Sequence, residues 1–80
     1  MVTGRIVRSK AGSDKDSFLV IVKTEDNMLY LSDGKRYKLA SPKRKNPKHI
    51  APTGKILDLK EHPTDKSLRK ALAEFRNINL

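Results

Sequence analysis

The sequence predicts a mainly β fold: a small curled β-barrel of four to five short strands, with a C-terminal amphipathic helix packed on its outside. Three observations favour this class. Short β-branched and aromatic runs alternate with turn residues, two of these runs are apolar on both faces, and the apolar spacing becomes helical near the C-terminus. With 80 residues we expect a single domain over 1–80, with the barrel at about 3–57 and the helix at about 65–76.

Three strands are expected in the first half of the chain, at residues 3–8, 18–23 and 28–31. The second and third show no regular alternation of apolar and polar residues. A strand of that kind needs cover on both of its faces. A polar loop over 9–16 and a turn at 25–27 connect the three strands.

Asp33-Gly34 predicts a two-residue hairpin turn, because a type I′ turn needs positive φ at both central positions. The strand that follows would be 35–39. It alternates, so Tyr37 and Leu39 would pack on one side while its two inner basic residues face solvent or a ligand.

The next stretch, residues 40–49, is expected to be a loop with two prolines and four positive charges. Residues 49–53 would form a short last strand. Pro52 confines that strand to an edge or a strand end, because proline cannot donate to a ladder. Residues 54–62 are expected to be a linker, with a short extended segment at 55–57 as an alternative.

Apolar residues near the C-terminus follow the i, i+3, i+4, i+7 spacing of one helical face: Leu68, Ala71, Leu72 and Phe75. Thr64 or Asp65 can cap the start of this helix. The apolar stripe is interpreted as core, with a partner interface as the alternative. We expect it to pack on the outside of the second and third strands.

The positive charge is concentrated in one part of the chain. The net charge is +9, and between Lys35 and Lys55 there are eight basic residues and no acidic one. The rest of the chain is close to balance. A local excess of this kind is typical of a surface that binds a polyanion. With only four aromatic residues, recognition of shape and phosphate in folded RNA is favoured over base stacking on single strands.

Catalytic and metal chemistry find no support in the sequence. There is no cysteine, and the two histidines, His49 and His62, match no zinc spacing. Asp14, Asp16 and Glu25 fall in a calcium-loop register, but Phe18 and its neighbour occupy positions that need an oxygen ligand and a glycine. We therefore expect no enzyme activity, no cofactor and no small-molecule substrate.

We expect no targeting or membrane-spanning segment. We expect no signal peptide, because no basic region is followed by an apolar stretch of signal-peptide length. The longest apolar run, 18–22, is far shorter than the roughly 20 residues that span a bilayer. The chain is expected to be complete, cytoplasmic and without a membrane partner.

The segment from Gly4 to Lys15 resembles a KOW motif, the strand-loop-strand element of many ribosomal proteins and transcription elongation factors. It reads Gly-Arg-Ile-Val-Arg-Ser-Lys-Ala-Gly-Ser-Asp-Lys and continues into the apolar run at 18–22. Over about residues 3–76 the chain resembles small bacterial KOW-domain RNA-binding proteins, which are similar to KOW-type large-subunit ribosomal proteins of archaea and eukaryotes. Gly12 matches the motif's central glycine. Asp16 departs from it, because a second glycine often stands there.

This resemblance implies an SH3-like barrel that binds RNA, with ribosomal RNA of the large subunit as the favoured target, and that associates with the ribosome. The main phosphate-contacting surface is predicted to comprise Lys35, Arg36, Lys38, Lys43, Arg44, Lys45, Lys48 and His49. A second patch would comprise Arg5, Arg8, Lys10, Gly12 and Lys15.

Several of these residues have a purely structural alternative. The basic run at 43–45 can be a solvated loop, and Gly12 can serve only a positive-φ turn. His49 can end a strand rather than contact phosphate, and Tyr30 and Tyr37 are expected to pack rather than stack on bases.

Two other functions compete with RNA binding. An SH3-like protein-interaction module would dock its basic patch on acidic transcription or translation factors. A nonspecific DNA-compacting protein would use the same charges on duplex DNA.

Overall fold

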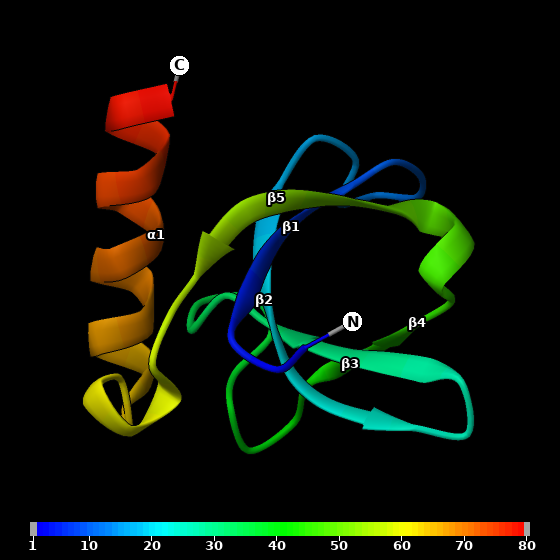
Figure 1. The fold of residues 1–80 in the computed structure, drawn as a ribbon, viewed down its shortest axis with the longest axis horizontal. Coiled ribbons are helices and arrows are strands. Elements are labelled where there is room, and N and C mark those ends of the chain that lie inside the picture. The colour runs from blue at the N-terminus through cyan, green and yellow to red at the C-terminus, as the bar shows by residue number, and fades with distance from the viewer. Residues whose placement is uncertain (1, 80) are drawn as a thin grey trace.

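Five antiparallel strands in one sheet and a C-terminal helix make up the computed structural model, which describes residues 2–79 (Figure 1). The mainly β prediction is therefore confirmed. The elements are β1 Arg5–Ser9, β2 Phe18–Glu25, β3 Met28–Ser32, β4 Lys43–Lys45, β5 Ile50–Ile56 and α1 Asp65–Asn79, with 3₁₀ turns η1 Pro47–His49 and η2 Leu59–Glu61.

The strand order is β4-β3-β2-β1-β5. β4 and β5 are edge strands, and in the part of the chain that the structure describes they do not pair with each other, so the hydrogen-bonded sheet is curled but open. The turn η1 connects these two edges along the chain (Figure 1). Pro52 lies in β5, opposite Val7, which confirms its expected place on an edge strand.

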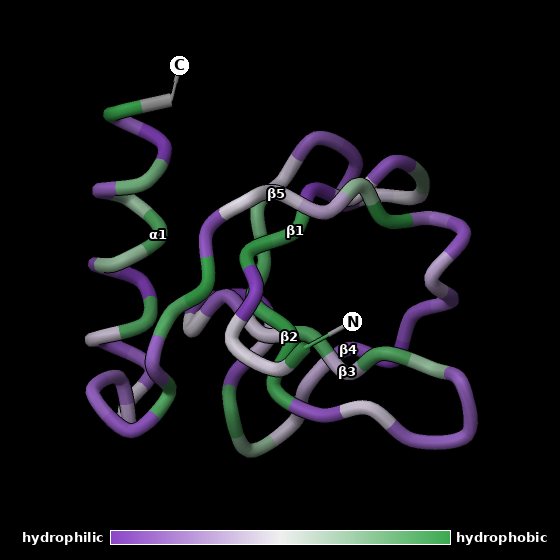
Figure 2. The backbone as a smooth tube through the Cα atoms, viewed as in Figure 1, coloured by the Kyte–Doolittle hydropathy of each residue, from purple (hydrophilic) through white to green (hydrophobic). Residues whose placement is uncertain are grey.

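Of the two doubly apolar strands, β2 receives the two-sided cover that was predicted, whereas the residues of β3 join only the inner cluster. On the inner side of the curl, Val7, Leu19, Ile21, Leu29, Leu31 and Ile50 form one buried cluster. On the outer side, Ile6, Val20, Leu68 and Leu72 form a second one. Hydrophobic residues line these strands, whereas the β1–β2 loop and the β4–η1 segment are hydrophilic (Figure 2).

The helix begins where the sequence indicated. The Thr64 hydroxyl accepts a hydrogen bond from the Ser67 backbone N–H at 3.1 Å, as expected of an N-cap residue. Asp65 instead accepts a bond from the Leu39 backbone N–H at 2.7 Å. The helix packs on the outer cluster of β1 and β2, with Phe75 edge-on to Phe18 at 5.2 Å. The predicted contact of the helix with β2 is therefore confirmed, but its second partner is β1 and not β3.

The hairpin predicted at Asp33-Gly34 does not form. The two-residue turn with positive φ at both positions lies earlier, at Asp26 and Asn27 (51° and 63°). Asp33 keeps a negative φ in the described structure, and its carboxylate accepts bonds from the N–H groups of Lys35 and Tyr37, both at 2.9 Å. This side-chain bonding competes with a ladder, so residues 35–39 form no strand.

The segment between β3 and β4 differs from the prediction in a second way. Tyr37 packs against the inner cluster and Leu39 against the outer one, so the two side chains do not share a face. The partner of β3 is β4, inside the stretch predicted to be a loop, with Tyr30 opposite Arg44. The backbone at Gly34 approaches Asp65 so closely that a Cβ there would overlap the Asp65 carbonyl oxygen.

Candidate nucleic-acid interface

Lys43, Arg44 and Lys45 form a strand, and this separates side chains that a loop would have left together. Successive residues of a strand point to opposite faces. Lys43 and Lys45 lie opposite Leu31 and Leu29, on the side of the inner cluster. Arg44 lies opposite Tyr30, on the other face of the sheet. The predicted basic run is therefore divided between two faces.

Lys45 is largely buried and has a structural role. Its side chain is 10% exposed and that of Asp14 is 4% exposed, and the Lys45 Nζ lies 2.6 Å from Asp14 Oδ1. The ammonium also donates to Ser9 Oγ at 2.7 Å and to the Ala11 carbonyl at 3.0 Å. These three bonds use all three donors of the ammonium. Lys45 has no donor left for a phosphate, so it is removed from the candidate contact set.

The same ion pair fixes the conformation of the β1–β2 loop. The Ser9 hydroxyl, itself fully buried, bonds Asp14 Oδ1 at 2.8 Å, and β4 is thereby tied to a loop far away in sequence. Sequence reasoning missed Ser9 and Asp14 as site residues. The signal was a pair of acidic residues, Asp14 and Asp16, in a loop expected to contact phosphate, because such carboxylates need cationic partners.

The pKa of the Asp14 carboxyl is shifted by opposing effects. Burial raises it, but hydrogen bonds from Lys45 and Ser9 and the charge of Lys45 outweigh burial, so the pKa lies below the ordinary value of 3.8. A depressed folded-state pKa contributes stability above the unfolded pKa, and this contribution is lost as pH falls through the folded value.

We therefore expect the free energy of unfolding to fall as the pH is lowered below about 3.8. Urea unfolding over a pH series, in high salt to screen the exposed Lys23–Glu25 pair, measures this dependence. In the Asp14→Asn variant the dependence should become shallower. An identical pH dependence in both proteins would contradict the assignment.

Tyr37 brings two of the predicted cations together. The guanidinium of Arg36 lies 5.3 Å from the centre of its ring, and the Lys43 Nζ lies 5.9 Å from it. Arg36 also donates to Ser13 Oγ at 2.8 Å, which connects this pair to the β1–β2 loop. Tyr37 is half-buried against the inner cluster, so packing is its confirmed role and the two cations flank it.

The other end of the same loop contacts η1. The Lys10 backbone N–H donates to the His49 carbonyl at 2.8 Å. Gly12 has a φ of 87°, and a Cβ there would meet nothing closer than 3.5 Å. Glycine is therefore favoured here by the positive φ and not by close packing of another group against the backbone.

The β1–β2 loop thus links predicted residues from both patches into one surface. We call it the rim surface and define it by Lys10, Lys15, Arg36, Lys43, Lys48 and His49, all of which are exposed. Lys35 and Lys38 are exposed on the neighbouring segment.

Three other predicted residues lie away from the rim surface or are already engaged. Arg44 is on the opposite face of β4. Arg5 donates to the Thr53 carbonyl at 2.7 Å, and Arg8 pairs with Asp16 at 2.9 Å. Asp16 adopts a φ of 69°, the left-handed region that glycine favours.

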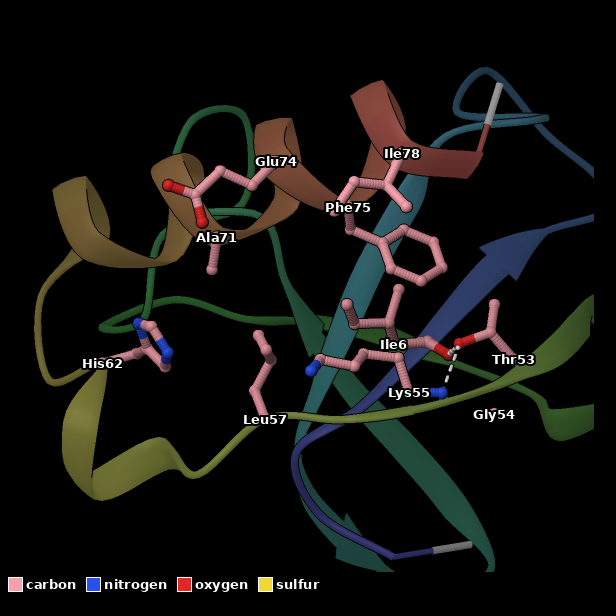
Figure 3. A pocket seen from close by; sticks show the side chains of 10 residues that line it. All are labelled: Ile6, Thr53, Gly54, Lys55, Leu57, His62, Ala71, Glu74, Phe75 and Ile78. Carbon is pink, nitrogen blue, oxygen red and sulfur yellow. Dashed lines mark hydrogen bonds between the residues drawn. The ribbon is translucent and has the colours of Figure 1, made fainter.

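An open groove of about 630 Å³ lies between β5 and α1 (Figure 3). Its lining is mainly apolar, with Leu57, Phe75 and Ile78 among the residues that border it. His62 and Glu74 also line the groove. Within residues 2–79 no group of three or more acidic, histidine or cysteine residues could hold a metal ion.

No helix in the described part of the chain is both long and apolar enough to cross a bilayer. Comparison with known proteins finds no family model that matches this chain and no curated protein with significant similarity to it.

Proposed function

We propose that this chain is an RNA-binding domain of the KOW type, an SH3-like barrel that contacts the sugar-phosphate backbone of structured ribosomal RNA through the rim surface. It acts in the cytoplasm, on the ribosome, with large-subunit RNA as the favoured target. It binds without catalysing a reaction.

The distribution of charge around the β1–β2 loop carries the proposal. Both acidic residues of the loop, Asp14 and Asp16, are neutralised by partners within the protein. The lysines of the rim surface are exposed and form no ion pair in the part of the chain that the structure describes. The loop therefore presents uncompensated positive charge, as phosphate binding requires.

Two backbone features support the KOW resemblance. Gly12, at the motif's central glycine, and Asp16, where the motif often has a second glycine, both adopt positive φ. Asp tolerates this conformation better than most residues. Asp16 thus adopts a backbone conformation that a glycine would also suit, and Arg8 compensates its charge.

Ultraviolet crosslinking of the tagged protein in its native cells, followed by sequencing of the attached RNA, tests the proposal. We expect reads clustered at one or a few positions of large-subunit ribosomal RNA. Reads that follow RNA abundance would contradict it. Partners that still co-purify after nuclease treatment would favour a protein-interaction module, and a preference for duplex DNA at fixed salt would favour DNA compaction.

A further inference from the structure

A second, smaller groove lies between α1 and the segment that follows β3. It measures about 270 Å³ and is lined by Ser17, Phe18, Asp33, Lys35, Arg69, Leu72, Ala73 and Arg76. The four helical residues follow the i, i+3, i+4, i+7 spacing, so they belong to one face of the helix. This face is adjacent to the stripe that packs on the sheet, and it shares Leu72 with that stripe.

The groove is strongly positive. Three cations line it, Lys35, Arg69 and Arg76, against one carboxylate, that of Asp33. Asp33 Oδ1 is already bonded by two backbone N–H groups. None of the three cations takes part in an ion pair within residues 2–79.

Arg69 is held in place at this groove. One of its terminal nitrogens donates to the Gly34 carbonyl at 2.7 Å, across 35 residues of sequence. A guanidinium has five N–H donors, so this bond orients the group and leaves further donors for a ligand. Arg76 and Lys35 are exposed.

The floor of the groove is apolar. Leu72 is 3% exposed, and Phe18 is half-buried beside it, against Phe75. A cationic border above an apolar floor matches the alternation of a nucleic-acid backbone, in which charged phosphates flank less polar sugars. A fully hydrated inorganic anion would make no use of such a floor.

Two residues that line the groove, Lys35 and Ser17, are close in sequence to residues of the rim surface. Lys35 precedes Arg36, which bonds Ser13, and Ser17 ends the loop that contains Ser13. An RNA strand that leaves the rim surface beside Arg36 would reach the groove next.

We propose that the Lys35–Arg69–Arg76 groove binds the sugar-phosphate backbone of the same RNA and extends the rim surface onto α1. This inference rests on the proposed function. The helix then has two roles, since one stripe closes the outer core and the neighbouring face contacts RNA.

The test compares Arg76→Ala with Lys70→Ala, a matched loss of one positive charge on an exposed residue of the same helix that does not line the groove. Binding of a fluorescently labelled RNA stem-loop is measured by anisotropy over a salt series. We expect Arg76→Ala to weaken binding about fivefold and to reduce the slope of log K against log salt by about one. Lys70→Ala should leave both unchanged.

A direct readout comes from the side-chain Nε–Hε resonances of Arg69 and Arg76, which should shift during an RNA titration of the wild-type protein. If the wild-type protein binds the stem-loop but Arg76→Ala behaves like Lys70→Ala, or these resonances stay in place, the groove is not an RNA site and the proposed function survives. If the wild-type protein does not bind RNA, the proposed function and the groove assignment both fail.

Discussion

Replacing Lys45 by Ala is expected to lower the free energy of unfolding by about 3 kcal/mol, because it leaves the buried Asp14 carboxylate without its counter-charge. Asp14 Oδ2 is also buried, and it has no hydrogen-bond partner in the described part of the chain. For a domain of this size, that loss corresponds to a fall in Tm of roughly 15 °C. Urea and thermal unfolding followed by circular dichroism measure both quantities.

Lys43 supplies the matched control for this experiment. It lies two residues away on the same strand and on the same face, but it is exposed and forms no ion pair among residues 2–79. Its replacement by Ala should change the free energy of unfolding by no more than about 0.5 kcal/mol. Equal losses in the two variants would show that the buried pair does not stabilise the domain.

A double variant, Asp14→Asn with Lys45→Met, distinguishes the loss of the ion-pair attraction from the cost of leaving a buried carboxylate unpaired. It removes both charges and keeps side chains of similar volume. Replacing a whole buried pair costs much less than removing one partner. We therefore expect the double variant to be more stable than Lys45→Ala alone. A double variant that is less stable than both Lys45→Ala and Asp14→Asn would contradict this account.

Replacing Lys10, Lys43 and Lys48 by Ala together is expected to weaken RNA binding about a hundredfold, if each loses about 1 kcal/mol of phosphate contact. The slope of log K against log salt should fall by about three, one for each contact. Because all three side chains are exposed, circular dichroism and Tm should stay close to those of the wild-type protein.

The control for this charge loss is a second triple variant, Lys55→Ala with Lys60→Ala and Lys70→Ala, which removes three exposed lysines outside the rim surface. It should keep most of the affinity. Equal weakening by both triple variants would show that binding depends on net charge and not on the rim surface. A variant of the whole run at 43–45 would be uninformative, because the loss of Lys45 changes stability as well as charge.

Several parts of the fold follow from residues that are close together in sequence. The apolar residues on both faces of 18–23 required cover on both sides, and the structure provides it with two clusters, whereas 28–31 joins only the inner one. The apolar spacing near the C-terminus placed α1 and its Thr64 cap. Pro52 placed β5 on an edge. Each of these depends on periodicity or on one residue's backbone chemistry, which neighbouring residues set.

The turn after β3 shows where local patterns stop being sufficient. Asp33-Gly34 has the composition of a hairpin turn, but the Asp33 carboxylate bonds its own following backbone, and Gly34 is pressed against the start of α1. That contact joins segments about 30 residues apart, and no short-range propensity contains it. The hairpin prediction was wrong for this reason.

The candidate site divides in the same way. The sequence by itself determined that positive charge is concentrated between Lys35 and Lys55, because the charge of a segment depends only on which residues it contains. Only the tertiary structure decided which cations are available. It buried Lys45 against a carboxylate 31 residues away, turned Arg44 to the opposite face, and brought Arg36 onto the β1–β2 loop. The physical reason is that desolvation and pairing of a charge depend on neighbours in space, which the chain acquires only when it folds.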